Sequence, residues 1–294
     1  MIHKTQHLMD KYNQLKATGL DPLIIYHYTS TKAFKGIFDN GCLWFTDRSS
    51  LNDMSEGLDV FDITLKVLED INISEDLKHY LKEECSRKDS ELITNGIKFF
   101  VLSFSTDRDN LNLWNYYSKN KNLQGYNIGF VRSELLNAYQ VTDQDKNVVQ
   151  PIHGRVIYDD KEKCEMIKDI IEILYFERNG CSTEEIGYFI LQKIVYIGCL
   201  FKDVHFKDEH EYRIVLPWNP NWSTLNTNIP DIKYRELNDL RIPYLPIQIE
   251  VGKCVKNITV SPTMDFEKAK TSQKKHLKPY PRIEIKKSAI PVRY

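Results

Sequence analysis

The chain has 294 residues, of which 41% are hydrophobic, so it can bury a substantial core as one large domain or as a domain with an inserted helical layer. Forty basic and 41 acidic side chains give a formal charge of −1, which offers no global field to attract nucleic acid or an anionic membrane. No stretch approaches the ~18 uninterrupted apolar residues of a membrane span, and the N-terminus lacks the apolar region of a signal peptide. These features predict a soluble, cytoplasmic protein with no membrane partner.

The six cysteines are scattered singly, so the sequence predicts neither a zinc knuckle nor a disulfide framework. No Walker loop, G-x-G-x-x-G, H-E-x-x-H or G-x-S-x-G motif occurs, which removes support from nucleotide-triphosphate enzymes, Rossmann dehydrogenases and zincins. A metal site built from His27, Asp53, Glu56 and Glu211 ranks last, because no pair of these ligands has a characteristic spacing. We therefore expect no metal.

His27 stands in an apolar strand predicted over residues 24–30, close to several hydroxyl-bearing residues. Ser30 or Thr31 can cap the helix that follows, and Gly41 is placed to end that helix before a second strand. A polar ring at a strand end suits a ligand site, but a core histidine with a satisfied hydrogen bond has the same pattern. This segment alone leaves the two interpretations about equal.

Hydrophobic periodicity predicts helices and strands along the whole chain. The predicted helices cover residues 5–18, 60–86 with a break at 72–74, 111–119, 133–136, 161–177, 182–200 and 263–275. The predicted strands after the first cover residues 43–46, 97–105, 126–131, 155–158, 212–216, 241–249, 255–260 and 282–285. No repeat or Pro/Gly/Ser linker interrupts this order. The sequence thus predicts a single α+β domain over residues 1–294, with helical insertions at about 58–92 and 161–200.

The strand over residues 97–105 ends in hydroxyl side chains and leads into a short aromatic helix. Ser105 stands at the strand end, and Trp114 and Tyr117 are three residues apart, so they share one face of that helix. We expect both rings at the wall of a cleft near Tyr28, where a planar ligand can stack. Core packing of Trp114 is the alternative, because large aromatic residues at helical spacing are usually buried.

A later segment, residues 206–216, places two carboxylates and a guanidinium in one row. Strand alternation puts Glu209, Glu211 and Arg213 on one face of the predicted strand. Buried charges are costly unless they are paired, so the row either lines a polar site or forms a solvated ladder of salt bridges. Periodicity alone does not separate these two interpretations.

An ordered set of short motifs resembles a bacterial family of proteins of unknown function, numbered 2971. The motifs are YHYTS at 26–30, LNDMSE at 51–56, the run from SFS at 103–105 through WNYY at 114–117 to Gly125 and Phe130, EHEYR at 209–213, and SAIPVR at 288–293. The resemblance covers nearly the whole chain from about Ile24. The family carries little established biochemistry, so this resemblance implies no activity by itself.

The opening YHYT, followed by a helix, a glycine and a strand, is also similar to the ADP-ribosyltransferase fold of DNA-targeting ADP-ribosylating toxins and RNA 2′-phosphotransferases. This resemblance implies a mixed or antiparallel split β-sheet core and NAD as the substrate. It also implies that His27 contacts the NAD ribose, that an aromatic residue stacks on nicotinamide, and that Glu211 stabilises the ribosyl cation. Ser105, with Trp114 or Tyr117, is the candidate for the stacking position.

Breaking the nicotinamide glycosidic bond builds positive charge on the ribose, which a carboxylate can stabilise without a metal. Glu211 would supply that carboxylate, Arg213 could bind the pyrophosphate, and Glu209 could orient the acceptor as a base. Tyr28 and Thr29 complete the predicted NAD-binding segment. On this assignment, Glu211→Gln should stop the reaction and leave the fold intact.

The leading hypothesis from the sequence is an NAD-dependent ADP-ribosyltransferase or NAD-cleaving effector, such as a bacterial toxin or an anti-phage defence component. Its partners would be NAD, an acceptor that is a nucleic acid or a protein, and a cognate inhibitor or defence-system protein. The rival hypothesis is a non-catalytic module that binds a nucleotide, a nucleic acid or a protein in the same cleft. Loss of Glu211 separates the two, because a binding site tolerates that loss and a transfer reaction does not.

Overall fold

The computed structural model describes residues 22–51, 59–88, 96–117, 124–139, 141–142, 148–149, 151–178, 180–219, 230–237 and 239–291. Contacts divide the chain into two compact units. The sheet unit comprises Leu23–Glu56, Gly96–Val156 and Lys202–Tyr294, and the helical unit comprises Met1–Pro22, Gly57–Asn95 and Ile157–Phe201. The chain is α+β, as the sequence predicts. The predicted leading helix at 5–18 lies outside the described residues.

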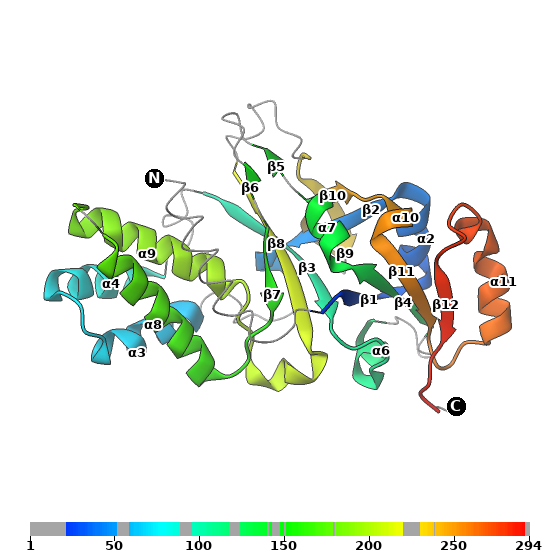
Figure 1. Ribbon diagram of the computed structural model, residues 1–294, viewed down its shortest axis with the longest axis horizontal. Helices are drawn as coiled ribbons and strands as arrows, with labels where there is room; N and C mark the ends of the chain where they lie inside the picture. The colour runs from blue at the N-terminus through cyan, green and yellow to red at the C-terminus, as the bar shows by residue number, and fades with distance from the viewer. Residues whose placement is uncertain are drawn as a thin grey trace. The chain divides into compact units, whose positions relative to one another are not determined.

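The sheet unit is built on a mixed, largely antiparallel sheet with the strand order β12-β11-β4-β1-β3-β2-β10-β9, from which β8 and then β7 branch at β3 (Figure 1). β11 and β12 pair in parallel. The strands are β1 Ile24–Ser30, β2 Cys42–Asp47, β3 Lys98–Ser105, β4 Gly125–Val131, β7 Ile152–Arg155, β8 Glu211–Trp218, β9 Lys233–Leu237, β10 Leu240–Gln248, β11 Val255–Val260 and β12 Glu284–Lys287. A separate two-stranded ladder joins β5 Val141–Thr142 to β6 Val148–Val149.

The sheet opens along one edge of β3. β8 pairs with β3 over the full length of β3, and so occupies one edge. On the other edge, β1 pairs with β3 at Ser105, whereas β2 pairs at Val101 and Phe100. β1 and β2 therefore take opposite ends of the same edge and diverge, with Ser103 in the gap between them. The candidate functional site lies at this opening.

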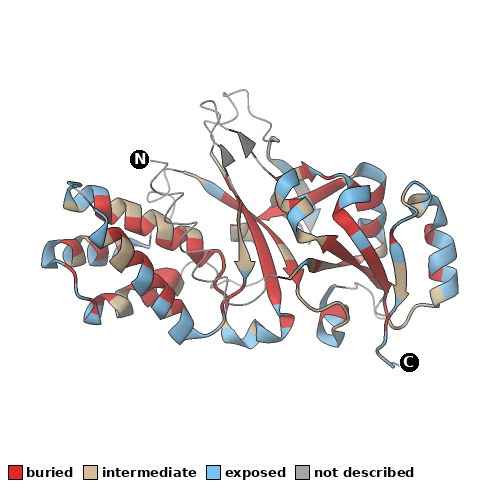
Figure 2. Ribbon diagram, viewed as in Figure 1, coloured by how far each residue is buried: buried red, intermediate tan, exposed pale blue. Residues whose placement is uncertain are grey.

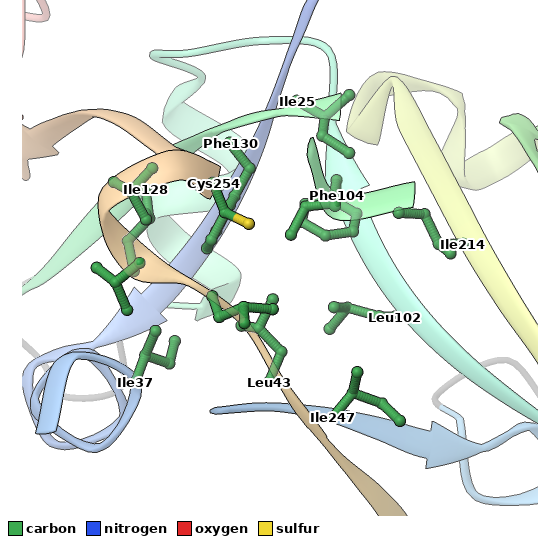
Figure 3. Packing of buried hydrophobic residues seen from close by; sticks show 14 of the residues in the cluster. Ile25, Ile37, Leu43, Leu102, Phe104, Ile128, Phe130, Ile214, Ile247 and Cys254 are labelled. Carbon is green, nitrogen blue, oxygen red and sulfur yellow. The ribbon is translucent and has the colours of Figure 1, made fainter. Parts of the chain in front are cut away.

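One face of the sheet carries the main hydrophobic core. Alternate residues of the strands point into it, among them Ile25, Phe104 and Phe130, and Figure 3 shows these side chains directed toward one another. Strands β3, β4 and β8 are buried almost throughout (Figure 2). Because β3 is buried on both faces of the sheet, its sequence is a nearly continuous run of apolar residues.

Helix α2 (Thr31–Asn40) follows β1 directly and packs its apolar face on this core. The Ser30 side chain accepts a hydrogen bond from the Ala33 backbone N–H at 3.3 Å, which is the N-cap that the sequence predicts. Gly41 ends the helix in the left-handed region, at φ 57°, and its N–H donates to the Ile37 carbonyl at 2.9 Å. Both predicted ends of this helix are confirmed. The cap fixes the point at which the chain leaves β1, and the pairing of His27 with Ile128 of β4 fixes the position of His27.

The helical unit contains α3 (Asp59–Asp70), α4 (Glu75–Arg87), α8 (Asp160–Phe176) and α9 (Thr183–Gly198), which lie in the segments predicted as helical insertions. α3 packs on α4 and α8, and α9 packs on α4 and α8. A capping box formed by Ser182 and Glu185 begins α9. Gly187 lets α9 approach α4 closely, because a Cβ there would lie 2.3 Å from the Tyr80 ring. The predicted break at 72–74 is confirmed by the gap between α3 and α4.

The sheet unit also contains the short helices η1 (Arg48–Ser50), α6 (Leu111–Tyr117), α7 (Arg132–Ala138), η2 (Val204–Glu209) and α10 (Val251–Cys254), and the longer helix α11 (Phe266–Leu277). Among the described helices, none combines the length and the apolar character needed to cross a bilayer.

Two strand predictions need correction. The strand predicted at 155–158 begins earlier, because β7 obtains its hydrogen bonds from β8 over Ile152–Arg155, whose side chains are mostly polar. β9 is missing from the predictions, because its sequence KYREL has no apolar run and its pairing with β10 creates the strand.

Candidate functional site

A cavity of about 860 Å³ opens in the sheet unit where β1 and β2 diverge from β3. Its volume lies within the range of pockets that hold small-molecule ligands and cofactors. Residues from β1, α2, β2, β3, α6, β8 and β9 line it. The lining includes most of the site residues predicted from the sequence: His27, Tyr28, Thr29, Ser105, Tyr117, Glu209, Glu211 and Arg213. The structure thus brings together residues that are far apart in the sequence, although His27 lies in the middle of β1 and not at the strand end that the sequence analysis assigns to it.

A buried cluster of four charged side chains forms one wall of this cavity. The Lys202 ammonium donates to Glu209 Oε2 at 2.7 Å and to Glu211 Oε2 at 3.1 Å. Arg213 donates from Nε to Glu211 Oε1 at 2.7 Å and from Nη2 to Glu211 Oε2 at 3.1 Å. All four side chains are almost completely buried. Two cations balance two carboxylates, which is the condition under which buried charges are tolerated.

The two carboxylates have opposite pKa shifts. Burial pushes the pKa of Glu211 upward, but the charges of Arg213 and Lys202, with hydrogen bonds from Arg213 and Ser103, outweigh burial and lower this pKa to about 2. Burial raises the pKa of Glu209 above its ordinary value in spite of the Lys202 charge. Burial alone would lower the pKa of Lys202, but the two carboxylates raise it. Glu211 is therefore ionised at any ordinary pH, and Glu209 is the member of the cluster that gains a proton more readily.

Glu209 and Glu211 reach Lys202 by a route that differs from the predicted strand alternation. Glu209 ends the 3-10 helix η2 and Glu211 begins β8, so the two residues do not belong to one strand. His210 between them adopts a left-handed conformation with φ 44°, and its ring contacts the Asp107 carboxylate at 2.7 Å. This turn at His210 directs both flanking carboxylates to the same lysine.

Lys202 is the central residue that sequence reasoning missed. It lies four residues after the end of helix α9 and precedes Glu209 by seven residues. A signal was present, because two buried carboxylates with one arginine lack a second cation, and Lys202 is a nearby basic residue after an apolar helix. The Lys202 ammonium also lies 4.7 Å from the centre of the Phe206 ring.

His27 contributes a neutral imidazole to the cavity. Its Nδ1 lies 3.1 Å from the Ser103 carbonyl oxygen, and because a carbonyl can only accept, Nδ1 carries the proton. Burial lowers the pKa of His27, which the hydrogen bond to Ser103 opposes. This hydrogen bond satisfies a backbone carbonyl in the gap between β1 and β2 and leaves Nε2 as an acceptor. His27 thus fits both sequence interpretations, as a satisfied histidine and as a residue of the cavity.

Trp114 does not lie at the cavity surface, contrary to its expected ligand-stacking role. Its side chain is fully buried, packs edge-on against Tyr28 with ring centres 4.8 Å apart, and donates from Nε1 to Asp109 at 2.8 Å. The Asp109 carboxylate also accepts hydrogen bonds from Ser288 and from the Ala289 backbone N–H. Trp114 therefore belongs to the core, as the alternative interpretation holds, although it does pack near Tyr28.

Hydroxyl groups at the ends of β1 and β3 are mostly engaged in the protein. Tyr28 donates to the Asp107 carbonyl at 2.9 Å and accepts from the Asn110 N–H at 2.8 Å, and burial raises its pKa. Ser105 Oγ donates to the Glu209 carbonyl at 2.8 Å and accepts from the Asp107 N–H. Ser105 therefore helps to position Glu209. Because its hydroxyl is already engaged as a donor and an acceptor within the protein, we do not assign it to a ligand. Thr29 is buried in the cavity wall.

Tyr116 and Tyr117 contribute exposed aromatic surface to the cavity, with 69% and 38% of these residues accessible, and Trp44 on β2 contributes a third exposed ring. Both tyrosines lie at the end of α6, which packs against β1. Tyr117 is a predicted site residue, whereas Tyr116 was missed because helical spacing pairs Tyr117 with Trp114. Two neighbouring residues at the end of a helix thus form this part of the aromatic wall.

Among the described residues, no three His, Cys, Asp or Glu side chains gather as metal ligands would. Asp53 and Glu56, which the metal alternative requires, lie outside the part of the chain that the structure describes.

A comparison with known families matches residues 113–214 to a family described as protein of unknown function DUF2971. The matched segment runs from α6 into β8 and includes Lys202, Glu209, Glu211 and Arg213, but not His27. This is a shorter stretch than the nearly full-length resemblance of the motifs. Neither the curated proteins nor the solved structures contain a match to the chain. Over residues 113–214, the chain is therefore similar to a family that has no assigned activity.

Proposed function

We propose that the protein breaks the bond between nicotinamide and ribose in NAD and transfers the ADP-ribose to an acceptor or to water. The observation that carries this proposal is the meeting of a neutral His27 with the carboxylates of Glu209 and Glu211 in one cavity of about 860 Å³. The resemblance to the ADP-ribosyltransferase fold names a histidine and a glutamate at strand ends for this reaction. The opening of the sheet between β1 and β2 is further support, because the same resemblance implies a split core.

In this reaction the bond between ribose C1′ and the nicotinamide nitrogen breaks, and its electron pair leaves with nicotinamide. Positive charge develops on the ribose. An acceptor oxygen then bonds to C1′ and gives up its proton to a base. A carboxylate held in a protein wall stabilises the developing charge more strongly than one in water, because its position is fixed and the local dielectric constant is lower.

Glu209 suits the charge-stabilising role better than Glu211, to which the resemblance assigns it. Both oxygens of Glu211 accept hydrogen bonds from cations, so much of its charge is already compensated. Glu209 has one such contact, from Lys202 to Oε2, and Oε1 accepts no hydrogen bond from the described residues. We therefore assign Glu209 to the ribose, and Glu211 to holding Lys202 and Arg213 in place.

His27 would position the ribose rather than transfer a proton. With its proton on Nδ1, the ring can accept a hydrogen bond at Nε2 from a ribose hydroxyl. The Ser103 carbonyl fixes the orientation of the ring before the ligand arrives, which reduces the entropy lost on binding. Tyr116 and Tyr117 offer partly exposed rings on which nicotinamide or adenine can stack.

The ADP-ribose acceptor would be a nucleic acid or a protein, as the sequence resemblance implies, with water as the acceptor for simple NAD cleavage. An NAD-consuming protein depletes a shared cofactor, so a cognate inhibitor or a defence-system partner would be needed to control it. The acceptor and the controlling partner are both part of this proposal.

A non-catalytic binding module is the second candidate, and one observation favours it. The four buried charges balance one another, and structural ion-pair networks of this kind also shift pKa values. On this interpretation the cavity would bind a nucleotide without cleaving it.

The test is release of nicotinamide from NAD labelled in the nicotinamide ring, with and without cell lysate as a source of acceptor. We expect Glu209→Gln to lower the rate by about 10²–10³. Since Glu209 must be ionised and its pKa is raised, the rate should also fall on the acid side at a pH above the ordinary carboxyl range. Glu284→Gln removes an exposed carboxylate that lies outside the cavity and should leave the rate unchanged. Binding of NAD without nicotinamide release by the wild type would select the binding module.

A further inference from the structure

A second arginine lines the same cavity from a different strand. Arg235 lies on β9, and its guanidinium crosses the neighbouring strand β10 to donate from Nη2 to Thr46 Oγ1 on β2 at 3.0 Å. Its Nε is buried without a hydrogen-bond partner among the described residues. The Arg235 guanidinium is thus held at Nη2 by Thr46, in a residue that lines the cavity.

The charge of Arg235 is uncompensated in the described part of the chain. No ion pair there includes Arg235, in contrast to Arg213, which is paired with Glu211. Glu236 also lines the cavity, but it forms no ion pair with Arg235. Burial lowers the pKa of Arg235, with Tyr244 opposing this shift. Partial burial of a guanidinium without a carboxylate partner carries a desolvation cost, which an anionic ligand would offset.

We infer that Arg235 binds a phosphate group of the ligand, and that this end of the cavity is the subsite for the diphosphate of a nucleotide. A guanidinium suits this task because its planar donors match two phosphate oxygens. The sequence assigns pyrophosphate binding to Arg213, but that guanidinium is 1% exposed and is occupied by Glu211. The inference rests on the proposed function for the identity of the nucleotide as NAD. The anion subsite itself does not depend on cleavage.

A natural reporter lies beside this subsite. Trp44 is 44% exposed, its ring stacks on Tyr244 with centres 4.4 Å apart, and the Arg235 guanidinium carbon lies 5.8 Å from the Trp44 ring centre. An anion at Arg235 should therefore change tryptophan fluorescence.

The experiment titrates inorganic pyrophosphate and ADP into the full-length protein, followed by tryptophan fluorescence and by calorimetry. Arg235→Gln should weaken both ligands by at least about tenfold, as expected for loss of a charge-assisted hydrogen bond. Arg235→Lys keeps the charge without the planar donors and should bind more weakly than the wild type but more tightly than Arg235→Gln. Arg241→Gln is the matched control, because Arg241 lies on the adjacent strand β10, is exposed, and does not line the cavity.

Equal affinities in the wild type and in a folded Arg235→Gln variant would overturn the inference, as would equal losses in Arg235→Gln and Arg241→Gln. Absence of pyrophosphate and ADP binding by the wild type would also overturn it. Binding that depends on Arg235, combined with no release of nicotinamide from NAD, would keep the phosphate subsite and reject the transferase function. Failure of the phosphate subsite can therefore be distinguished from failure of the proposed transferase function.

Discussion

Glu211→Gln should unfold more easily than the wild type, and the size of the effect follows from its ion pairs. The cluster lowers the Glu211 pKa from 4.5 to about 2, which corresponds to about 3 kcal/mol of stability at pH 7. The amide keeps the shape but removes the charge that faces Lys202 and Arg213. Breaking a buried ion pair costs about 3–5 kcal/mol, in agreement with this figure. The prediction from the sequence that this variant keeps its fold is thus narrowed to a folded but less stable protein.

The assay is urea unfolding followed by tryptophan fluorescence, since Trp44, Trp114 and Trp218 all lie in the sheet unit. The folded-state pKa of Glu211 is lowered, so its contribution is present above pH 4.5 and is lost as the pH falls toward 2. The stability difference between wild type and variant should shrink from about 3 kcal/mol at pH 7 to about 1 kcal/mol at pH 3. Glu284→Gln, at an exposed pair with Lys286, should show no measurable change. Stabilities of wild type and Glu211→Gln within about 0.5 kcal/mol at pH 7 would refute the reasoning.

Three further predictions concern the cavity and the sheet. Tyr117→Ala should weaken NAD binding and Trp114→Phe should leave it nearly unchanged, because Tyr117 lines the cavity and Trp114 is buried. Calorimetric titration with NAD measures both affinities, and a larger loss of affinity in Trp114→Phe than in Tyr117→Ala would place the ligand elsewhere. His27→Ala should raise KM for NAD more than it lowers kcat, so that high NAD restores much of the rate; a pure loss of kcat would contradict a positioning role. Gly129→Ala should destabilise the sheet unit by about 1–3 kcal/mol, because the new Cβ would lie 2.7 Å from Asn257 Oδ1. An unchanged midpoint of urea unfolding would count against this close contact between the paired strands β4 and β11.

Elements with strong local signals could be predicted from the sequence. The helix between Ser30 and Gly41 is specified by its cap residues, and the uninterrupted apolar run of β3 identifies a strand buried on both faces. β9 has neither signal, because its residues are mostly polar and it forms through pairing with β10. Prediction was therefore most successful where short-range features determine the structure.

The site was predictable in its residues but not in its contacts. Local patterns identify His27, Glu209 and Glu211, all of which line the cavity, but His27 lies in the middle of β1 and not at its end, and Glu209 ends η2. The burial of Trp114 and the bridging position of Lys202 depend on tertiary packing that spacing does not encode. The divergence of β1 and β2, which creates the cavity, is likewise a consequence of long-range pairing with β3.

The central claim is that Glu209 takes part in breaking the nicotinamide–ribose bond of NAD. The most direct test measures nicotinamide release by the purified wild type, Glu209→Gln and Glu284→Gln, with folding checked by circular dichroism. The account predicts release by the wild type and by Glu284→Gln, and a rate lower by about 10²–10³ in Glu209→Gln. No release by the wild type in the presence of cell lysate, or an undiminished rate in a folded Glu209→Gln variant, would contradict it.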